Sequence, residues 1–298
     1  MSALGMPCRI GRRRFLRAGG AAAGVVSLEA FPFHLFASET KKYATDRIKL
    51  GPRGVEVSRL AMGTGTNGVG GSSNQTRQLG VQGLAELFRA AYDQGVTFWD
   101  SADQYGTHPH VRAALKTVPR DKVAILTKSH AHTYKDMQAD IDRFRRELGT
   151  DYIDILLLHM MTGADWNLSN RGAMDAITEA QSKGIVRTKG TSCHTLEALK
   201  TAAAEPWVEV DLCRINPAQV AMDADPQTVI SVQKQIKAAG KGVIGMKILG
   251  AGRLRNKPDE ALQFALSLGT LDCFTIGSES RGEMEDLLRR IPLASTRG

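Results

Sequence analysis

From about residue 46 onward, short apolar runs alternate with amphipathic stretches, and this alternation restricts the possible folds more than any other feature of the sequence. The apolar runs are nearly continuous, as is typical of parallel strands that are covered on their outer side. Between them, segments such as Val81–Gln94, Asp136–Leu148 and Thr228–Ala239 carry apolar residues at helical spacing. The pattern indicates strands and helices in strict succession, which is typical of the α/β class.

The number of these units specifies the architecture. We expect strands at Leu60–Thr64, Thr97–Asp100, Val123–Lys128, Ile153–His159, Val186–Ser192, Asp211–Asn216, Val243–Ile248 and Cys273–Gly277. Eight strand–helix units over about 250 residues predict a single-domain (β/α)8 TIM barrel, with a doubly wound parallel sheet as the structural alternative. Ahead of the first barrel strand, Ile48–Val57 contains a Gly/Pro turn and is expected to form a hairpin able to plug the bottom of the barrel.

The beginning of the chain resembles an export signal. The segment GRRRFLRAGG, from Gly11 to Gly20, is similar to the twin-arginine (Tat) motif R-R-x-F-L-K. Two modest apolar patches follow, and both are shorter than the roughly 20 residues that a stable membrane span needs. We expect a twin-arginine signal peptide at residues 1–37, cut near Ala30 or Ala37, and a barrel domain at residues 38–298.

This reading makes the twin-arginine export machinery a partner and places the mature protein in the periplasm or outside the cell. A disordered basic tail is the alternative reading of the same residues.

Charge and cysteine usage exclude two classes of protein. The net charge is +8, but the first 37 residues hold five arginines and one glutamate and so account for half of it. The other basic residues are scattered, so we expect no nucleic-acid partner. Three of the four cysteines, Cys193, Cys213 and Cys273, lie in predicted strands and Cys8 precedes the apolar leader. We expect small buried thiols rather than a disulfide framework.

Ionisable residues stand where the catalytic face of a barrel is expected. Active sites in such barrels gather where the strands end and the following loops begin. Asp100, Lys128 and His159 end three successive predicted strands, and Tyr105 lies in the loop after Asp100. A strand-end aspartate or a lone histidine is common in proteins, but these four side chains are directed to the same face. We therefore take them as candidate catalytic residues.

These four side chains can together protonate a carbonyl oxygen. A tyrosine hydroxyl has an ordinary pKa near 10, and a neighbouring lysine ammonium favours the phenolate and lowers that pKa. A buried Lys128 needs a counter-charge, which Asp100 can supply. His159 can orient a carbonyl or share the proton. The set therefore predicts a proton donor for an alkoxide that forms as hydride arrives.

Three segments carry a family resemblance: WDSADQYG (Trp99 to Gly106), LTKS (Leu126 to Ser129) and LLLH (Leu156 to His159). In order and spacing they resemble the catalytic segments of the aldo-keto reductase superfamily, and the likeness runs from about Ile48 to Leu288. It implies a barrel and NAD(P)-dependent interconversion of a carbonyl (aldehyde, ketone or sugar) and an alcohol. By resemblance Tyr105 is the proton donor, Lys128 tunes it, Asp100 pairs with Lys128, and His159 orients the carbonyl.

The resemblance also implies contacts to the nicotinamide and the pyrophosphate of NADP or NAD. GTSCH (Gly190 to His194) is similar to the segment that receives the nicotinamide amide, so Ser192 is an expected contact. Two positions depart from the family: Cys193 stands where Asn is usual, and Arg214 where Gln is frequent. GMKILGAG (Gly245 to Gly252) resembles the loop that covers the pyrophosphate. There Lys247 would add charge and Gly250 would allow close approach of the backbone.

The adenosine side of the cofactor is expected at IGSESRGEMED, from Ile276 to Asp286. Gly277 and Ser278 fit a phosphate at the following helix N-terminus. Glu283, with Glu279 close in sequence, stands where NADP users often have Arg or Gln. A carboxylate repels a 2′-phosphate but accepts a hydrogen bond from a free ribose hydroxyl, which favours NAD, whereas Arg281 favours NADP. The choice between the two cofactors stays open.

Export raises a further expectation about the cofactor. Free nicotinamide nucleotide is not expected outside the cytoplasm, whereas the twin-arginine route carries folded proteins. The nucleotide would therefore be loaded before export and stay bound, with oxidation of one substrate regenerating it for another.

Other motifs keep alternative functions open. Gly63–Gly68 matches G-x-G-x-x-G, but the next helix is expected only from about residue 79, so the loop does not open a helix as the dinucleotide fingerprint requires. The His-x-His pairs, one at His108 and His110 and one at His130 and His132, suggest a metal-dependent barrel hydrolase. A non-catalytic exported binding barrel is the third hypothesis. We expect no metal in the reductase reading.

Overall fold

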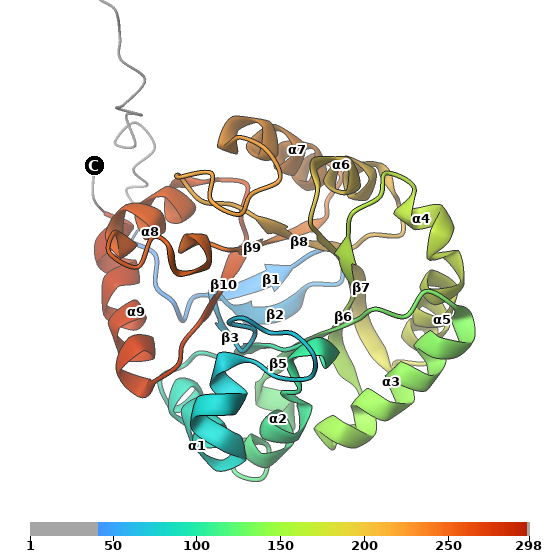
Figure 1. The fold of residues 1–298 in the computed structure, drawn as a ribbon, viewed down its shortest axis with the longest axis horizontal. Helices are drawn as coiled ribbons and strands as arrows, with labels where there is room; N and C mark the ends of the chain where they lie inside the picture. The colour runs from blue at the N-terminus through green and yellow to red at the C-terminus, as the bar shows by residue number, and fades with distance from the viewer. Residues whose placement is uncertain (1–40, 297–298) are drawn as a thin grey trace, which may run out of the picture. The chain divides into compact units, whose positions relative to one another are not determined.

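The computed structural model describes residues 41–296, so the predicted signal peptide lies outside the described residues. In this range the chain forms a closed barrel of eight parallel strands, in the order β10-β3-β4-β5-β6-β7-β8-β9 (Figure 1). The strands are β3 Leu60–Gly63, β4 Phe98–Asp100, β5 Ala124–Ser129, β6 Ile153–Met161, β7 Val186–Cys193, β8 Val210–Arg214, β9 Gly242–Met246 and β10 Cys273–Gly277. The predicted TIM barrel is confirmed, and the doubly wound sheet is wrong because β10 pairs with β3 and closes the sheet.

Helices surround the barrel. They are α1 Asn74–Asp93, α2 His108–Ala114, α3 Tyr134–Leu148, α4 Trp166–Ser169, α5 Arg171–Ser182, α6 Leu196–Ala204, α7 Pro226–Ala238, α8 Pro258–Ser267 and α9 Arg281–Ala294, with short 3₁₀ turns η2 Asp103–Tyr105, η3 Arg120–Lys122 and η4 Gly250–Gly252. Within residues 41–296, none of the helices combines the length and the apolar character that crossing a membrane requires.

The helix after the glycine loop begins earlier than its apolar pattern suggests. We expected a start near residue 79, but α1 begins at Asn74, where Ser73 and Thr76 form a capping box. Gly80 then interrupts the helix with φ 60° and ψ −174°. The apolar face belongs mostly to the part after Gly80, whereas the first turns are formed by local capping. The prediction of the helix start was therefore wrong, because it used periodicity alone.

The predicted hairpin forms and closes the bottom of the barrel. Strands β1 Arg47–Leu50 and β2 Val55–Ser58 pair antiparallel, and Figure 1 shows them behind the centre of the ring. Leu50 and Val57 are fully buried in the inner core with side chains of the barrel strands. At the turn, a Cβ on Gly51 would lie 2.9 Å from the carbonyl oxygen of Glu209, just before β8. The turn thus packs directly on the amino-terminal ends of the barrel strands.

Cysteines lie in both layers of the core. Cys193 and Cys213 belong to the layer between strands and helices, and Cys273 belongs to the inner layer. All three are buried and free, as predicted. Burial raises the pKa of each thiol, so all three stay protonated and unreactive at neutral pH.

Candidate active site

Four predicted catalytic side chains lie together at the carboxyl end of the barrel. Asp100 is the last residue of β4, Lys128 the penultimate residue of β5, and His159 lies near the end of β6, the next strand around the barrel. Tyr105 ends η2, the turn that follows β4. The ring centres of Tyr105 and His159 are 5.7 Å apart, and Lys128 Nζ is 4.9 Å from the centre of the Tyr105 ring.

Lys128 is a buried ammonium with a buried counter-charge. Only 1% of its surface is exposed, and its Nζ donates to Asp100 Oδ1 at 2.5 Å and to the Ser101 carbonyl at 2.8 Å. Burial lowers the pKa of Lys128, but Asp100 and Tyr105 outweigh that effect and the pKa is raised. The second oxygen of Asp100 accepts from the Thr275 hydroxyl at 2.7 Å. The pair is therefore hydrogen-bonded on both sides, as a buried ion pair requires.

Thr275 was missed by the sequence analysis. It lies on β10, and its side chain reaches Asp100 only because barrel closure places β10 beside β3. The available signal was a hydroxyl at an inward-facing position of an otherwise apolar strand, two residues after the inward-facing Cys273.

Tyr105 is a neutral phenol whose ring is closely packed by its neighbours. Burial raises the pKa of Tyr105 and the Lys128 ammonium opposes this, but burial prevails. The expected effect of lysine is present in direction, yet it does not produce a lowered pKa here. A Cβ on Gly65 or Gly68 would lie 2.5 or 2.4 Å from the Tyr105 ring. The G-x-G-x-x-G loop therefore packs against the Tyr105 ring, and its glycines leave the space that the ring occupies.

His159 is a neutral imidazole surrounded by cations and other imidazoles. Burial, followed by Lys128 and His130, lowers the pKa of His159 to about 2. His130 stacks on it with ring centres 4.5 Å apart, and His194 approaches edge-on at 6.5 Å. The Nδ1 atom of His159 is buried without a hydrogen-bond partner in the described part of the chain. Because Nδ1 is buried, the neutral ring can accept or donate a hydrogen bond to a substrate only through its other nitrogen.

A bulge in β6 sets the position of His159. The pairing of β6 with β7 shifts between Leu158 and Met161, and Met160 has a φ of 60°. The Met160 amide donates to the Ser192 hydroxyl at 3.4 Å. The strand therefore continues two residues beyond its predicted end at His159, and the bulge re-aims the histidine at the rim.

The predicted cofactor residues lie at the ends of the neighbouring strands β7 to β10. Ser192 is buried in β7. Arg214 ends β8 and already donates to Asp223, with its Nε 2.8 Å from Oδ1, and to the His194 carbonyl. Lys247 follows β9 with a φ of 58° and has no carboxylate within ion-pair distance among residues 41–296. Burial, followed by Arg214 and Lys128, lowers the pKa of Lys247.

The other predicted cofactor residues form a glycine turn and a helix N-terminus. Gly250, Ala251 and Gly252 all have positive φ angles, between 53° and 88°. Gly277 ends β10, the buried Ser278 follows, and α9 begins at Arg281. An unpaired lysine, a glycine turn and a helix N-terminus are features that hold phosphates, so these residues fit a dinucleotide.

Carboxylates dominate the expected adenosine end. Glu283 accepts from the Glu279 amide at 2.7 Å, while the Glu279 carboxylate accepts from Asn74 at 2.8 Å and from Gln78 at 2.9 Å. Arg281 pairs with Glu285 at 2.7 Å. Arg281, which would favour a 2′-phosphate, is thus paired with a carboxylate of the same helix, α9.

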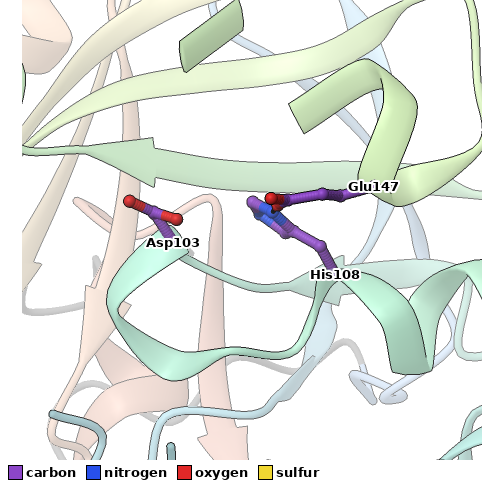
Figure 2. Close-up of side chains that lie close together, drawn as sticks. All are labelled: Asp103, His108 and Glu147. Atoms are coloured by element: carbon purple, nitrogen blue, oxygen red, sulfur yellow. Dashed lines mark hydrogen bonds and ion pairs between the residues drawn. The ribbon is translucent and has the colours of Figure 1, made fainter. Parts of the chain in front are cut away.

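The His-x-His pairs do not form a common metal site in the described range. His130 Nε2 is 2.5 Å from Gln104 Oε1, and His132 Nδ1 is 2.5 Å from Asn170 Oδ1. One group of three possible ligands exists among residues 41–296: Asp103, His108 and Glu147, whose ligand atoms lie within 4.8 Å of one another (Figure 2).

This group already contains a cation. The Arg143 guanidinium donates to both oxygens of Asp103, at 2.7 and 2.9 Å, and to Glu147 at 3.2 Å. The ring nitrogens of His108 lie 2.7 Å from Glu147 and 2.7 Å from Thr127. The positive charge that a metal ion would supply is therefore supplied by the protein.

Comparisons with known proteins agree with this geometry. Residues 61–267 match the aldo/keto reductase family. The chain is 28% identical over 171 residues to a probable aldo-keto reductase of Glycine max. This match covers 53% of this chain and 47% of that protein. It is 24% identical over 227 residues to a D-threo-aldose 1-dehydrogenase of a Pseudomonas species, covering 65% and 67% respectively. The chain thus spans about half the length of the first relative and two thirds of the second.

Solved structures match the fold. An aldo-keto reductase from Bacillus halodurans in its holo form superposes with a TM-score of 0.67 at 17% identity. The superposition covers 85% of this chain and 91% of that structure, which shows a shared barrel.

Proposed function

Because the chain belongs to the aldo/keto reductase family of NAD(P)-dependent oxidoreductases, we propose that it interconverts a carbonyl group and an alcohol by hydride transfer. The observation that carries this proposal is the Lys128–Asp100 pair beside the Tyr105 ring, with a neutral His159 edge-on to the same ring. These are a proton donor, a cation that favours its deprotonation and an imidazole able to orient a carbonyl.

In the reduction direction, His159 holds the carbonyl oxygen by a hydrogen bond and Tyr105 donates its proton to that oxygen as negative charge develops. The Lys128 ammonium stabilises the phenolate that remains, and Asp100 keeps the ammonium charged and in place. In the oxidation direction the phenolate takes the proton back. Ser192 and Arg214 would hold the nicotinamide end of the cofactor, and Lys247, Gly250 and the N-terminus of α9 the phosphates. The bound cofactor supplies or accepts the hydride.

The substrate proposed is an aldehyde, a ketone or a sugar. A relative of this chain is a D-threo-aldose 1-dehydrogenase, which supports testing aldoses first. We also propose that the nucleotide is bound in the cytoplasm and exported with the folded protein, directed by Arg12 and Arg13 of the N-terminal segment. Nucleotide released by denaturing the exported protein would support this, and exported protein free of nucleotide would contradict it.

The test of the function is a titration followed by turnover. The protein is first denatured to remove any bound nucleotide and then refolded. It is then titrated with NADH and with NADPH, and binding is followed by fluorescence. We expect saturable binding, tighter for NADH because Glu279 and Glu283 favour a free ribose hydroxyl. A panel of aldoses, aldehydes and ketones is then assayed.

The matched variants are Tyr105→Phe and Tyr134→Phe, since Tyr134 is exposed at the start of α3 and its hydroxyl donates to Glu179 on α5. Tyr105→Phe should lose turnover on the order of 100-fold or more with unchanged cofactor binding, because only the proton donor is removed. Tyr134→Phe should behave as wild type. Equal turnover in the two variants would refute the proposed role of Tyr105.

A further inference from the structure

A salt bridge connects the turn that carries Tyr105 to helix α3. Arg143, in the third quarter of α3, places its two terminal nitrogens 2.7 and 2.9 Å from the two oxygens of Asp103. Asp103 opens the η2 turn, whose last residue is Tyr105. A forked guanidinium–carboxylate contact restrains orientation as well as distance. It therefore fixes how the turn faces the helix.

The same guanidinium lies among three carboxylates. Besides Asp103 it donates to Asp140 at 2.7 Å and to Glu147 at 3.2 Å. Residues 140, 143 and 147 are three and four positions apart, so they share one face of α3. The hydrogen bond that Arg143 donates to Asp103 raises the pKa of Arg143 most; burial opposes this, and the hydrogen bonds donated to Asp140 and Glu147 raise the pKa further. Arg143 is thus the permanent cation that lets three carboxylates meet.

The two helix carboxylates continue the network to β5. Glu147 Oε2 is 2.7 Å from His108 Nδ1, and the other ring nitrogen of His108 is 2.7 Å from the Thr127 hydroxyl. Figure 2 shows the Glu147 carboxylate directed at the His108 ring, with Asp103 facing both. Asp140 accepts from the Ser129 hydroxyl at 2.5 Å. Thr127 and Ser129 are the immediate neighbours of Lys128 in β5.

We propose that Arg143 is a positioning residue that holds the Tyr105 turn in register with the β5 segment carrying Lys128. Arg143 has no contact with Tyr105 or Lys128 themselves; it acts through Asp103 on one side and through Asp140 and Glu147 on the other. This inference rests on the proposed function for its effect on turnover. Its structural part, that Arg143 keeps the η2 turn ordered, does not depend on that function.

The physical reason is that loss of Arg143 leaves three carboxylates close together without a cation. Asp103 then turns towards solvent, and the turn shifts Tyr105 relative to Lys128 and His159. A misplacement of about 1 Å at reacting groups can lower a rate on the order of 100-fold. The predicted cofactor residues lie on β7, β8 and β10, in the loops after β9 and β10 and at the start of α9, and do not touch this network, so cofactor binding is expected to be unaffected.

The experiment compares Arg143→Gln with Arg145→Gln. Arg145 lies on the same helix and pairs with Asp142 and the Asp151 carbonyl, away from η2. We expect Arg143→Gln to lower kcat on the order of 10- to 100-fold with an unchanged Kd for the nucleotide, and Arg145→Gln to match wild type. Arg143→Lys keeps the charge but not the fork, and is expected to recover only part of the loss.

Hydrogen exchange supplies the readout that does not need turnover. The amides of Tyr105 and Gly106 bond to the carbonyls of Ala102 and Asp103 inside the turn. Their exchange should become faster in Arg143→Gln and in Asp103→Asn, and stay as in wild type in Arg145→Gln. If the wild type proved inactive on every substrate, the proposed function would fail while this measurement still decided the inference.

A double variant completes the test. If Arg143 acts through Asp103, then Asp103→Asn with Arg143→Gln should lose no more kcat than the more damaged single variant. The proposal is overturned if exchange at residues 105 and 106 is unchanged in Arg143→Gln. It is also overturned if losses in the double variant multiply, or if nucleotide affinity falls as much as kcat.

Discussion

At the scale of single residues, Asp211 is a carboxylate that the proposed chemistry does not use. It lies on β8 with no exposed surface, and its Oδ1 accepts from Thr191 at 2.7 Å and from the Cys193 thiol at 3.0 Å. Its Oδ2 has no hydrogen-bond partner in the described part of the chain. Burial raises the pKa of Asp211 to about 6 against the hydrogen bonds from Cys193 and Thr191. Asp211 is therefore a destabilising charge at neutral pH.

Replacement of Asp211 by Asn should stabilise the protein. The amide keeps an oxygen for the two donors and removes the buried charge. Because the folded pKa lies above the unfolded value of 3.8, the destabilisation is absent below pH 3.8 and complete above about pH 6. We expect the variant to gain up to about 3 kcal/mol of unfolding free energy at pH 7, and this gain to vanish towards pH 4. Urea unfolding at both pH values measures it; a gain that is the same at both would contradict the explanation.

At the scale of elements, the loop between β3 and α1 shows how a motif can mislead. Gly63–Gly68 has the spacing of a dinucleotide loop, yet two of its glycines face the ring of Tyr105. Periodicity could not reveal this, because the tyrosine lies about 40 residues further along the chain. The G-x-G-x-x-G spacing instead leaves room for an aromatic ring, and the loop lies against Tyr105 of the candidate active site.

Substitution of Gly68 by Ala tests that role. The backbone of Gly68 does not have a positive φ, so alanine is acceptable there, but its Cβ would lie 2.4 Å from Tyr105 Cδ1. The ring or the loop has to move, and we expect kcat to fall on the order of 10-fold or more. Gly269→Ala is the control, because no atom lies within 4 Å of its added Cβ. Wild-type kcat in Gly68→Ala would show that the loop yields without moving the tyrosine.

At the scale of the whole molecule, the buried histidines of the candidate active site make the fold sensitive to acid. The pKa values of His159 and His194 are lowered to about 2 and about 4, in both cases chiefly by burial. Their ordinary value is 6.5, so the unfolded chain takes up protons that the folded protein refuses, and stability falls as pH drops below 6.5. Asp211 has the opposite effect, because its protonation in the folded protein raises the stability as the pH falls from 6 to 4. Burial also lowers the pKa values of His110 and His130 and raises that of Asp223, so four histidines against two aspartates leave a net loss of stability in acid.

The expected result is a lower unfolding free energy at pH 5 than at pH 7. His159 alone accounts for about 2 kcal/mol of that loss, since pH 5 is 1.5 units below its unfolded pKa. His159→Gln should therefore reduce the pH dependence by about this amount, and Asp211→Asn should make it steeper. Denaturant unfolding of the nucleotide-free protein from pH 7 to pH 5 provides the measurement. An unchanged pH dependence in His159→Gln would show that this imidazole takes up a proton as readily in the folded protein as in the unfolded chain.

Local pattern was sufficient for much of the architecture. Each strand was predicted within two residues of its observed ends, because a run of apolar residues between polar loops is a property of neighbouring residues. The same is true of the hairpin under the barrel and of Asp100, Lys128 and His159 at the strand ends. Once the strands form one parallel barrel, their carboxyl ends meet at one face, so three local facts predict a common site.

The sequence by itself thus determined the strand order, the barrel and the four side chains at its rim, since each depends on spacing along the chain. The tertiary structure alone decided their chemistry: Asp100 and Thr275 meet although 175 residues separate them. It likewise decided that burial raises the pKa of Tyr105 more than Lys128 lowers it, and that glycines lie against the ring. It also decided that Arg143 connects the turn carrying Tyr105 to α3. These features depend on burial and on contacts between distant segments, which exist only after the barrel has closed.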